Sequence, residues 1–588
     1  MASFAKRTHT CGELRPAAIG TRVSLNGWVD VRRDLGGVIF IDLRDRYGKT
    51  QVVFNPQHND QAHQLAKELR SEFVIAVTGI VEARPEGTTN PDLPTGQIDL
   101  MAEEMSILNR ADTPPFPIDG DVDAGEDLRL KYRYLDLRRP SLQRNLQFRH
   151  RLYQLVHKFF DENNFLEVET PVLMKSTPEG ARDYLVPSRV HRGRFYALPQ
   201  SPQTYKQLLM VSGLDRYVQI VKCFRDEDLR ADRQPEFTQI DVEMSFVDEE
   251  DIREISERLM QRVFKEMRGI DLALPLPRLT YKEAIESYGS DKPDTRFGLR
   301  LSCVNNLVGD AGFRVFSDAV KKGGVVGGFI VPGGGSMTRN QLDGLVEYTK
   351  SLGAGGLVYA RWTENGVECP IDKFLGKELL QKMVEQMGGK PGDLALLVSD
   401  AWTKAYAILG TLRLEMAKRL KLIDENKLDL LWVTDFPLLE YSEEEKRFVA
   451  VHHPFTSPNF DDLGLLETDP GSARARAYDL VLNGTEIAGG SIRIHDRALQ
   501  SRMFALMGIG EEEASRKFGF LLNAFRFGAP PHGGIAFGFD RMVMILTGMK
   551  SIREVIAFPK TANAVSLMDE APGDVDEKQL RELHIRIV

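Results

Sequence analysis

The sequence has few cysteines and no long apolar run, and each absence excludes a class of protein. Its four cysteines, Cys11, Cys223, Cys303 and Cys369, lie far apart without a CxxC pair. This pattern argues against a disulfide framework and a zinc site, and predicts buried thiols. No window approaches the roughly 18 apolar residues of a membrane helix, and the first residues lack the apolar centre of a secretory signal. We therefore expect a cytoplasmic protein without membrane contact.

The chain also lacks an excess of positive charge. It has 76 Lys and Arg side chains against 85 Asp and Glu, which gives a formal net charge of −9. A protein that coats nucleic acid through bulk charge is thereby excluded, and any contact with nucleic acid must be local. The length of 588 residues, 42% of them hydrophobic, predicts three or four domains with substantial cores.

The first fifth of the chain is rich in β-forming residues. Short β-rich runs recur between Val23 and Leu108, and a helix-like run from Gln61 to Glu72 interrupts them. Five strands with a helix between the third and the fourth is the order of an OB-fold, whose open face often binds single-stranded nucleic acid; another small β-barrel is the alternative. The Pro-rich segment 113–121 indicates a linker. The basic stretch RLKYRYLDLRRP after it is expected either to meet a phosphate backbone or to form a solvated hinge.

The rest of the chain predicts one catalytic domain with an insertion. Apolar residues at helical spacing run from Leu146 to Asn163 and lead into the strand-like FLEVETPVL. From Thr295 to about Leu422 the composition becomes Gly-rich and mixes strand and helix patterns, which indicates an inserted α+β domain. Segments with chemistry-bearing residues resume beyond it, with HHPFTSP, NGTEIAGGSIRIH and GGIAFGFDRMVMILTG.

Two segments carry candidate phosphate-binding residues. Segment 222–243 predicts a β-hairpin whose loop presents Arg225, and a guanidinium binds phosphate oxygens in two places without losing its proton. Taken alone, a charged hairpin is more often a solvated surface. The segment GGIAFGFDRMVMIL joins a Gly-rich strand to a helix that opens at Asp540 and Arg541, where backbone can approach a ligand closely. No GxxxxGK[ST] and no GxGxxG after a strand occurs, so a different nucleotide-binding fold is needed.

These segments resemble motifs one, two and three of the class II aminoacyl-tRNA synthetases. The matching parts are the long helix with its strand and Pro171, the hairpin FRDE, and AFGFDR. The segments TPEGARDYLVPSR, QSPQTYKQLLM, QPEFTQIDVE and HHPFTSP are similar to those of the bacterial-type aspartyl-tRNA synthetases. The resemblance implies a multidomain α+β protein with an N-terminal OB-fold β-barrel, a class II synthetase antiparallel-sheet catalytic domain and an inserted α+β domain.

The resemblance also implies a domain order. We expect an OB-fold anticodon-binding domain at 1–110, a hinge at 111–143, a first catalytic part with motifs one and two at 144–290, the inserted α+β domain at 291–424, and a second catalytic part with motif three and a C-terminal extension at 425–588. The inserted domain has no role that the sequence reveals beyond a spacer. A homodimer is expected, because the motif one helix and strand form the dimer interface in this class.

The implied activity is ATP-dependent ligation of L-aspartate to tRNA-Asp, with ATP as a substrate and Mg²⁺ as a cofactor. Whether tRNA-Asn is also charged stays open. An asparaginyl or lysyl relative is an alternative that the insertion and the pair Lys206 and Arg493 disfavour. A non-catalytic tRNA-binding paralogue is another, and the presence of Arg225, Glu486 and Arg541 argues against it.

For the nucleotide, the resemblance implies catalytic roles for Arg225, Glu486 and Arg541. Arg225 would hold the aspartate α-carboxylate and the ATP α-phosphate, and Arg541 the γ-phosphate. Phe237 would stack on adenine. Asp479 and Glu486 would coordinate Mg²⁺, which prefers oxygen ligands. The remaining residues of the implied ATP site are Asp226, Glu227, Gln234, Gly538, Phe539 and Asp540.

For aspartate, the resemblance implies a pocket with charges of opposite sign at its two ends. The residues around the ammonium would be Ser201, Gln203 and Asp241. Lys206 and Arg493, aided by His452, would hold the side-chain carboxylate, Gln239 would touch the α-carboxylate, and Glu179 lies in a loop that closes over the substrate. His452 and His453 are interpreted as structural or orienting residues. Asparagine would point amide hydrogens at donors, which leaves buried groups unpaired at roughly 2–5 kcal/mol.

In the expected barrel, Arg33, Phe40 and Gln51 match positions that contact the anticodon in this family. An aromatic ring can stack on an unstacked base while polar groups read its edge; Phe40 as barrel core is the alternative. Leu35 and Gly87 match positions associated with the choice between tRNA-Asp alone and both tRNAs. Leu35 points to discrimination and Gly87 to relaxation.

Overall fold

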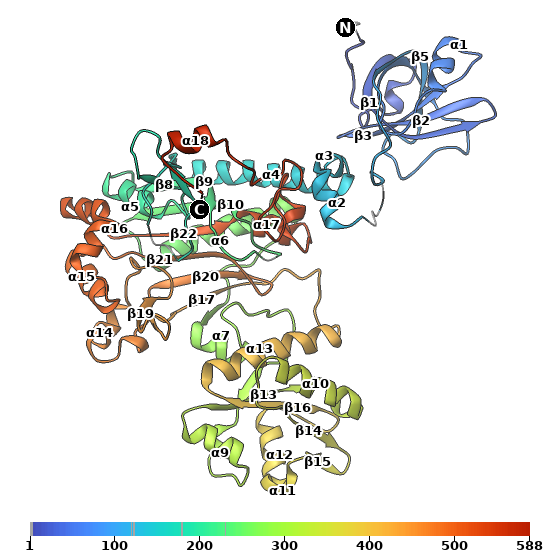
Figure 1. Cartoon of the computed structure of the whole chain (residues 1–588). Helices are drawn as coiled ribbons and strands as arrows, with labels where there is room; N and C mark the ends of the chain where they lie inside the picture. Colours follow the sequence, from blue (N-terminus) through green and yellow to red (C-terminus); the bar gives the residue numbers. More distant parts are fainter. Residues whose placement is uncertain (1–3, 119, 121–123, 178–179, 230, 588) are drawn as a thin grey trace. The chain divides into compact units, whose positions relative to one another are not determined.

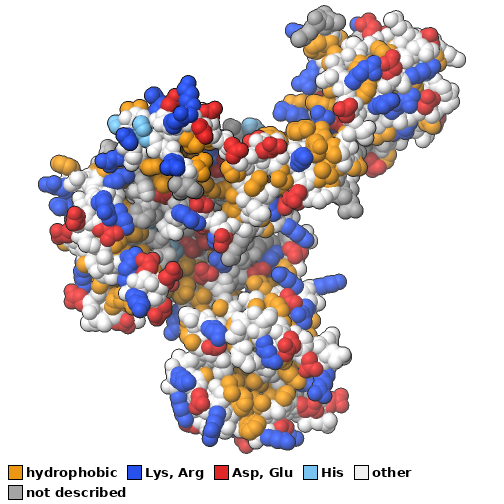
Figure 2. Space-filling view, viewed as in Figure 1, with side chains coloured by type: hydrophobic (Ala, Val, Ile, Leu, Met, Phe, Trp, Pro, Cys, Tyr) orange, Lys and Arg blue, Asp and Glu red, His pale blue; other side chains and the backbone are white. Residues whose placement is uncertain are grey.

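The computed structural model describes residues 4–118, 120, 124–177, 180–229 and 231–587. The chain forms two compact units, each described by itself. The first unit comprises Met1–Arg151, Leu229–Gln234 and Thr547–Asp574, and the second comprises Leu152–Asp228, Pro235–Leu546 and Val575–Val588. Among the described residues, no helix is both long and apolar enough to cross a bilayer. Blue basic and red acidic side chains are interspersed on the face shown in Figure 2.

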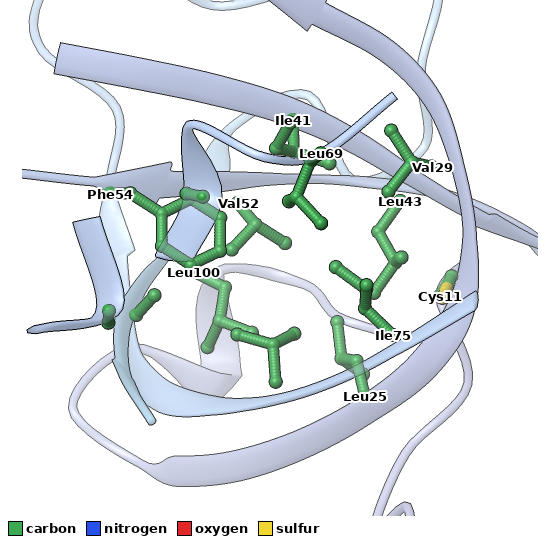
Figure 3. Close-up of a cluster of buried hydrophobic side chains, with 14 of the residues drawn as sticks. Cys11, Leu25, Val29, Ile41, Leu43, Val52, Phe54, Leu69, Ile75 and Leu100 are labelled. Atoms are coloured by element: carbon green, nitrogen blue, oxygen red, sulfur yellow. The ribbon is translucent and has the colours of Figure 1, made fainter. Parts of the chain in front are cut away.

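The first unit contains a closed five-stranded barrel with strand order β1-β2-β3-β5-β4 (Figure 1). Its elements are β1 (Arg22–Leu35), β2 (Val38–Asp45), β3 (Gly48–Phe54), α1 (Asp60–Ala66), β4 (Val74–Ala83) and β5 (Ile98–Asn109). Alternate residues of β2 point into the barrel, so that Ile39, Ile41 and Leu43 join its core. Ile41 and Leu43 are labelled in Figure 3. The predicted strand order with its interposed helix is confirmed, although the helix ends at Ala66 rather than at Glu72.

The basic stretch after the barrel is tied into internal contacts. It forms α2 (Glu126–Lys131), α3 (Arg133–Asp136) and the start of α4 (Pro140–Glu162). Arg133 is buried and donates hydrogen bonds to the carbonyl oxygens of Arg553, Ile556 and Ala557. The ion pairs of its other arginines are Arg129–Asp136, Arg129–Glu554, Arg139–Asp136 and Arg138–Glu72. These arginines therefore already have acidic partners, and the two expectations for this stretch stay predictions.

The second unit contains an eight-stranded sheet with strand order β11-β17-β20-β21-β22-β10-β9-β6. The strands are β6 (Leu166–Glu167), β9 (Arg216–Phe224), β10 (Glu236–Ser245), β11 (Arg278–Thr280), β17 (Leu430–Thr434), β20 (Ala477–Leu482), β21 (Thr485–Ile492) and β22 (His532–Gly538). Pairing is antiparallel from β17 to β9 and parallel only at the two edges. The predicted antiparallel catalytic sheet is thus present, although β6 is much shorter than the run FLEVETPVL suggested.

A separate five-stranded sheet, β12-β13-β16-β14-β15, forms the insertion. Its strands are β12 (Leu301–Cys303), β13 (Val325–Val331), β14 (Val358–Thr363), β15 (Gly366–Glu368) and β16 (Leu394–Asp400). Alternate residues of β16 enter two different cores, Leu396 on one face and Leu397 on the other. Both faces are therefore covered, which explains the unbroken apolar run LALLV. The domain boundaries proposed above stay predictions.

Helices and two small hairpins complete the second unit. The helices of four or more residues are α5 (Gln203–Val211), α6 (Glu249–Arg268), α7 (Tyr281–Tyr288), α8 (Asn305–Val308), α9 (Arg314–Lys321), α10 (Arg339–Ser351), α11 (Asp372–Leu375), α12 (Lys377–Gln386), α13 (Trp402–Arg419), α14 (Leu465–Thr468), α15 (Arg497–Leu506), α16 (Glu511–Ala524), α17 (Phe539–Leu546) and α18 (Glu577–Glu582). The hairpins are β7 (Leu185–Pro187) with β8 (Phe195–Ala197) and β18 (Leu439–Ser442) with β19 (Arg447–Ala450).

All four cysteines are free, but Cys303 is exposed, so the prediction of a buried thiol is wrong there.

Candidate active site

Polar side chains line one face of the eight-stranded sheet along β10. Because side chains alternate along a strand, Gln239, Asp241 and Glu243 share a face. Directly opposite residues of neighbouring strands lie on the same face, and the β22 partners of these three are Gly538, Ala536 and Gly534. Small residues therefore form a floor beside the polar row.

The floor continues across the sheet to a second acidic side chain. Ala536 pairs with Gly489 of β21, and Gly489 pairs with Asp479 of β20. Asp241 and Asp479 are thus three strand spacings apart, about 14 Å at the backbone. The intervening residues are glycine and alanine, which leaves room for a ligand between two carboxylates.

Four buried charges meet at the β10 side of this floor. Lys206 Nζ lies 3.1 Å from Asp241 Oδ1 and 3.4 Å from Glu243 Oε2. Arg493 Nε lies 3.0 Å from Glu243 Oε1, and its Nη1 donates to Ser491 Oγ at 2.7 Å. All four charged residues are buried. Two cations and two carboxylates therefore balance each other in the absence of substrate.

The two carboxylates of this cluster have different environments. Burial opposes ionisation of Glu243, but the charges of Arg493 and Lys206 outweigh it and hold its pKa below the usual value. Burial raises the pKa of Asp241, which Lys206 offsets only in part. Asp241 Oδ2 has no hydrogen-bond partner within the described part of the chain. The Oδ2 atom of Asp241 can therefore accept a hydrogen bond from a second cation, and contact with a substrate ammonium requires such an acceptor.

Two histidines border the same cluster. Burial lowers the pKa of His453 to about 3, and the nearby charges of Arg493 and Lys206 act in the same direction. Burial also lowers the pKa of His452, whose ring packs edge-on against Phe436 with centroids 4.6 Å apart. Among the described residues, neither Nε2 atom has a hydrogen-bond partner. Both rings are therefore neutral near pH 7, each with a buried nitrogen available to a ligand.

The candidate phosphate-binding residues lie at the ends of the central strands. Arg225 follows β9, and its guanidinium lies 5.0 Å from the centroid of the Phe237 ring. Arg541, in the first turn of α17, donates to the carbonyl oxygen of Glu486 at 3.1 Å. This contact joins the motif three helix to the start of β21, where Glu486 lies.

Asp479 and Glu486 are the residues that fit a divalent cation. A Cβ on Gly489 would lie 2.7 Å from Asp479 Oδ1 and 3.6 Å from Glu486 Oε1, so both carboxylates flank this glycine. Burial, followed by repulsion from Glu486, raises the pKa of Asp479 well above its usual value. No cluster of three or more potential metal-ligating side chains occurs among the described residues. Two carboxylates that leave further positions to phosphate oxygens and water suit Mg²⁺.

Several other sequence-predicted residues have structural partners. Asp540 accepts a hydrogen bond from the Thr238 amide at 2.7 Å, and Phe539 packs on Tyr153. Asp226 pairs with Arg182, and Gln234 exchanges two hydrogen bonds with the Lys560 backbone.

The remaining residues of the predicted substrate and ATP sites lie as follows. Gln239 accepts from Cys223 Sγ at 3.2 Å, and Ser201 Oγ accepts from the Gln203 amide at 3.3 Å. Glu227 is half-buried in the loop that follows Arg225. Gly538 ends β22 immediately before α17. Glu179 lies outside the described residues.

In the barrel, the predicted anticodon residues share an outer face. Arg33 forms a double hydrogen bond with Asp42 at 2.7 and 3.0 Å and also donates to Gln51 Oε1 at 3.1 Å. Phe40 pairs with Arg33 across β1 and β2 and is only half-buried, outside the barrel core. Leu35, 62% exposed, ends β1, and Gly87 lies in the β4–β5 connection with φ +80°.

Glu243 is a residue of the cluster to which the sequence analysis gave no role. It contacts both Lys206 and Arg493, the two cations assigned to the substrate carboxylate. The signal was available, because Glu243 continues the alternation of Gln239 and Asp241 in QPEFTQIDVE. Ser491, which orients Arg493, had no comparable signal.

Comparisons with known proteins agree with this geometry. The family described as "tRNA synthetases class II (D, K and N)" matches residues 125–562, and the "OB-fold nucleic acid binding domain" matches residues 23–108. The chain belongs to this class II tRNA synthetase family. The family, the OB-fold and the ligase reaction class predicted from the sequence are thus confirmed.

Relatives extend over the full chain. The "Aspartate--tRNA(Asp/Asn) ligase" of Caldanaerobacter subterraneus subsp. tengcongensis is 57% identical over 99% of this chain and 98% of that protein. The "Aspartate--tRNA ligase" of Halalkalibacterium halodurans is 54% identical over the same shares. The solved asparaginyl-tRNA synthetase of Pyrococcus horikoshii has the same fold, with a TM-score of 0.60 at 18% identity over 95% of this chain and 98% of that one.

Replacing Glu243 by glutamine tests the charge balance of this family member's pocket. Two buried cations then share one carboxylate, so we expect Glu243→Gln to lower the free energy of unfolding by about 3–5 kcal/mol. Saturating aspartate is expected to raise the melting temperature of the variant more than that of the wild type, because the ligand carboxylate supplies the missing charge. Thermal denaturation with and without aspartate measures both effects.

Glu257→Gln is the matched control for this experiment. Glu257 is also buried, but it accepts hydrogen bonds from the neutral Trp432 side chain and Leu276 amide. Equal melting temperatures and equal aspartate shifts in wild type and Glu243→Gln would contradict the charge-balance account.

Proposed function

We propose that the chain is an aspartate–tRNA ligase that activates L-aspartate with ATP and transfers it to tRNA-Asp. The observation that carries this proposal is the buried charge cluster beside a glycine floor, in which Lys206 pairs with Asp241 and Arg493 pairs with Glu243. Its charges complement the two carboxylates and the ammonium of aspartate. The names of full-length relatives support the same substrate.

Aspartate binds with its side-chain carboxylate toward Lys206 and Arg493 and its ammonium toward Asp241. Ser201 and Gln203 assist at the ammonium, and Gln239 at the α-carboxylate. Selection against asparagine follows from charge rather than size, since an amide nitrogen cannot accept from two cationic donors. His452 and His453 stay neutral and orient the carboxylate through their unpaired Nε2 atoms.

Activation is an in-line attack of the ionised α-carboxylate on the α-phosphorus of ATP, which gives aspartyl-adenylate and pyrophosphate. No general base is needed, because the nucleophile is already an anion. Arg225 holds both reacting groups and stabilises the charge that develops between them, Phe237 stacks on adenine and Arg541 holds the γ-phosphate. The 3′-hydroxyl of the tRNA then attacks the mixed anhydride and displaces AMP.

Asp479 and Glu486 would hold Mg²⁺, which would neutralise phosphate charge. Glu227 belongs to the same nucleotide site. The raised pKa of Asp479 means that a divalent cation at this position favours the ionised carboxylate.

The barrel recognises the anticodon on the face that carries Arg33, Phe40 and Gln51. The protein acts as a homodimer in the cytoplasm. Exposed apolar side chains after α4 support a subunit interface there: Leu166, Val172 and Leu173 are 51%, 48% and 52% exposed.

The direct test is ATP-dependent attachment of labelled aspartate to purified tRNA-Asp and, separately, to tRNA-Asn. Charging of tRNA-Asp is expected. Charging of tRNA-Asn as well would agree with the relaxed specificity that Gly87 indicates. No charging of tRNA-Asn would agree with the discrimination that Leu35 indicates. If neither tRNA accepts aspartate, the proposed function is wrong.

Arg225→Ala is expected to abolish aspartate-dependent pyrophosphate exchange, a loss of at least about a thousandfold, because it removes the cation that stabilises the transition state. Lys222→Ala is the control. It removes a cation from β9, three residues before Arg225, but Lys222 pairs with Thr238 on the opposite sheet face from Phe237. Exchange at the wild-type rate in Arg225→Ala would refute the active-site assignment.

Phe40→Ala is expected to raise the KM for tRNA about tenfold or more while leaving pyrophosphate exchange unchanged, because a stacked base contributes roughly 1–3 kcal/mol. Tyr47→Ala removes another exposed aromatic ring of the barrel, beyond the far end of β2, and serves as the control. A parallel loss of exchange and charging in Phe40→Ala would mean that Phe40 acts through stability.

A further inference from the structure

A small hairpin in the second unit carries a group of exposed cations. Strands β7 and β8 pair from Leu185↔Ala197 to Pro187↔Phe195, and the connection between them contains Arg189, Arg192 and Arg194. The connection has defined internal hydrogen bonds. The Ser188 amide donates to the Arg194 carbonyl oxygen at 2.9 Å, and Ser188 Oγ accepts from the His191 amide at 3.1 Å.

These arginines differ from those of the basic stretch 129–140 in having no acidic partner among the described residues. All three are exposed, and within the part of the chain that the structure describes none of them forms an ion pair. Exposed apolar and aromatic side chains accompany them. Val190, Phe195 and Tyr196 are 73%, 50% and 38% exposed. On a chain with net charge −9, three unpaired arginines within six residues form a local positive surface.

The base of the hairpin adjoins the proposed catalytic arginine on both sides. The amide of Phe224, immediately before Arg225, donates to the Pro199 carbonyl oxygen at 2.8 Å. The amide of Asp226, immediately after Arg225, donates to the Arg182 carbonyl oxygen at 3.0 Å. The segments before and after the hairpin are therefore both hydrogen-bonded to the residues that flank Arg225.

We propose that the hairpin Leu185–Ala197 binds the sugar-phosphate backbone of the tRNA acceptor end. This inference rests on the proposed function, in which the terminal adenosine must reach Arg225. The phosphates that precede this adenosine then leave the site beside the hairpin. Arginines neutralise such phosphates, and exposed aromatic rings stack on the unpaired bases of a single-stranded 3′ end.

The test is the triple variant Arg189→Ala, Arg192→Ala, Arg194→Ala in the full chain. Its KM for tRNA in aspartate charging is expected to rise about tenfold or more. Loss of three phosphate contacts should also make the plot of log kcat/KM against log salt concentration shallower by about two, since each contact to a single strand contributes roughly 0.7. Pyrophosphate exchange without tRNA is expected to stay at the wild-type rate.

Two control variants separate local contact from net charge. Lys265→Ala, Lys427→Ala, Arg581→Ala removes the same number of positive charges from side chains that are 58%, 48% and 78% exposed and have acidic partners. It should leave the salt slope unchanged. Replacing the three hairpin arginines by lysine should restore most of the tRNA affinity, because a phosphate backbone accepts either cation.

An unchanged tRNA KM and salt slope in the alanine triple variant would overturn this inference. A loss of tRNA-independent exchange, or a changed molecular mass in sedimentation, would also overturn it by assigning the hairpin to the ATP site or to a subunit interface. These outcomes are distinct from failure of the proposed function, in which wild-type protein would not charge tRNA at all.

Discussion

The buried cluster of Lys206, Asp241, Glu243 and Arg493 is the constraint on which the rest of the site depends. Four charges removed from water are tolerated only when each has a partner in good geometry. The cluster therefore fixes α5, β10 and the end of β21 relative to one another. It also determines which residue can occupy the facing position of β22. A Cβ at Gly534 would lie 2.0 Å from Glu243 Oε2, so only glycine fits there. The glycine floor is a consequence of placing a carboxylate over β22.

This arrangement gives the pocket its charge before substrate arrives. Glu243 already neutralises much of the positive charge of Lys206 and Arg493, so the pocket does not hold two uncompensated cations. Asp241 keeps one unpaired oxygen and a raised pKa, which leaves part of its interaction capacity for the ammonium. At the other side of the floor, burial also raises the pKa of Asp479, and repulsion from Glu486 raises it further. In the proposed function, one side of the site thus selects the amino acid and the other holds a divalent cation.

Much of this fold follows from local sequence patterns. The barrel was predictable because alternation in β2 and the helix between β3 and β4 are local features. The β9–β10 hairpin and the junction of β22 with α17 were predictable because each is one contiguous segment. The contacts of Glu243 were not predictable from local patterns. Arg493 lies 250 residues further along the chain, and only the sheet register brings the two residues together. The partners of the arginines in the basic stretch 129–140 were not predictable for the same reason, because Arg129 pairs with Glu554, 425 residues away.

The membership of this chain in the class II synthetases sets its reaction class, and we propose that the charge cluster sets which amino acid it accepts. The most direct measurement of that claim is calorimetric titration of the wild-type protein with aspartate and with asparagine at pH 7. The account predicts that aspartate binds at least about thirtyfold more tightly, as roughly 2 kcal/mol or more for unpaired buried donors requires. Equal affinities for the two amino acids would contradict it.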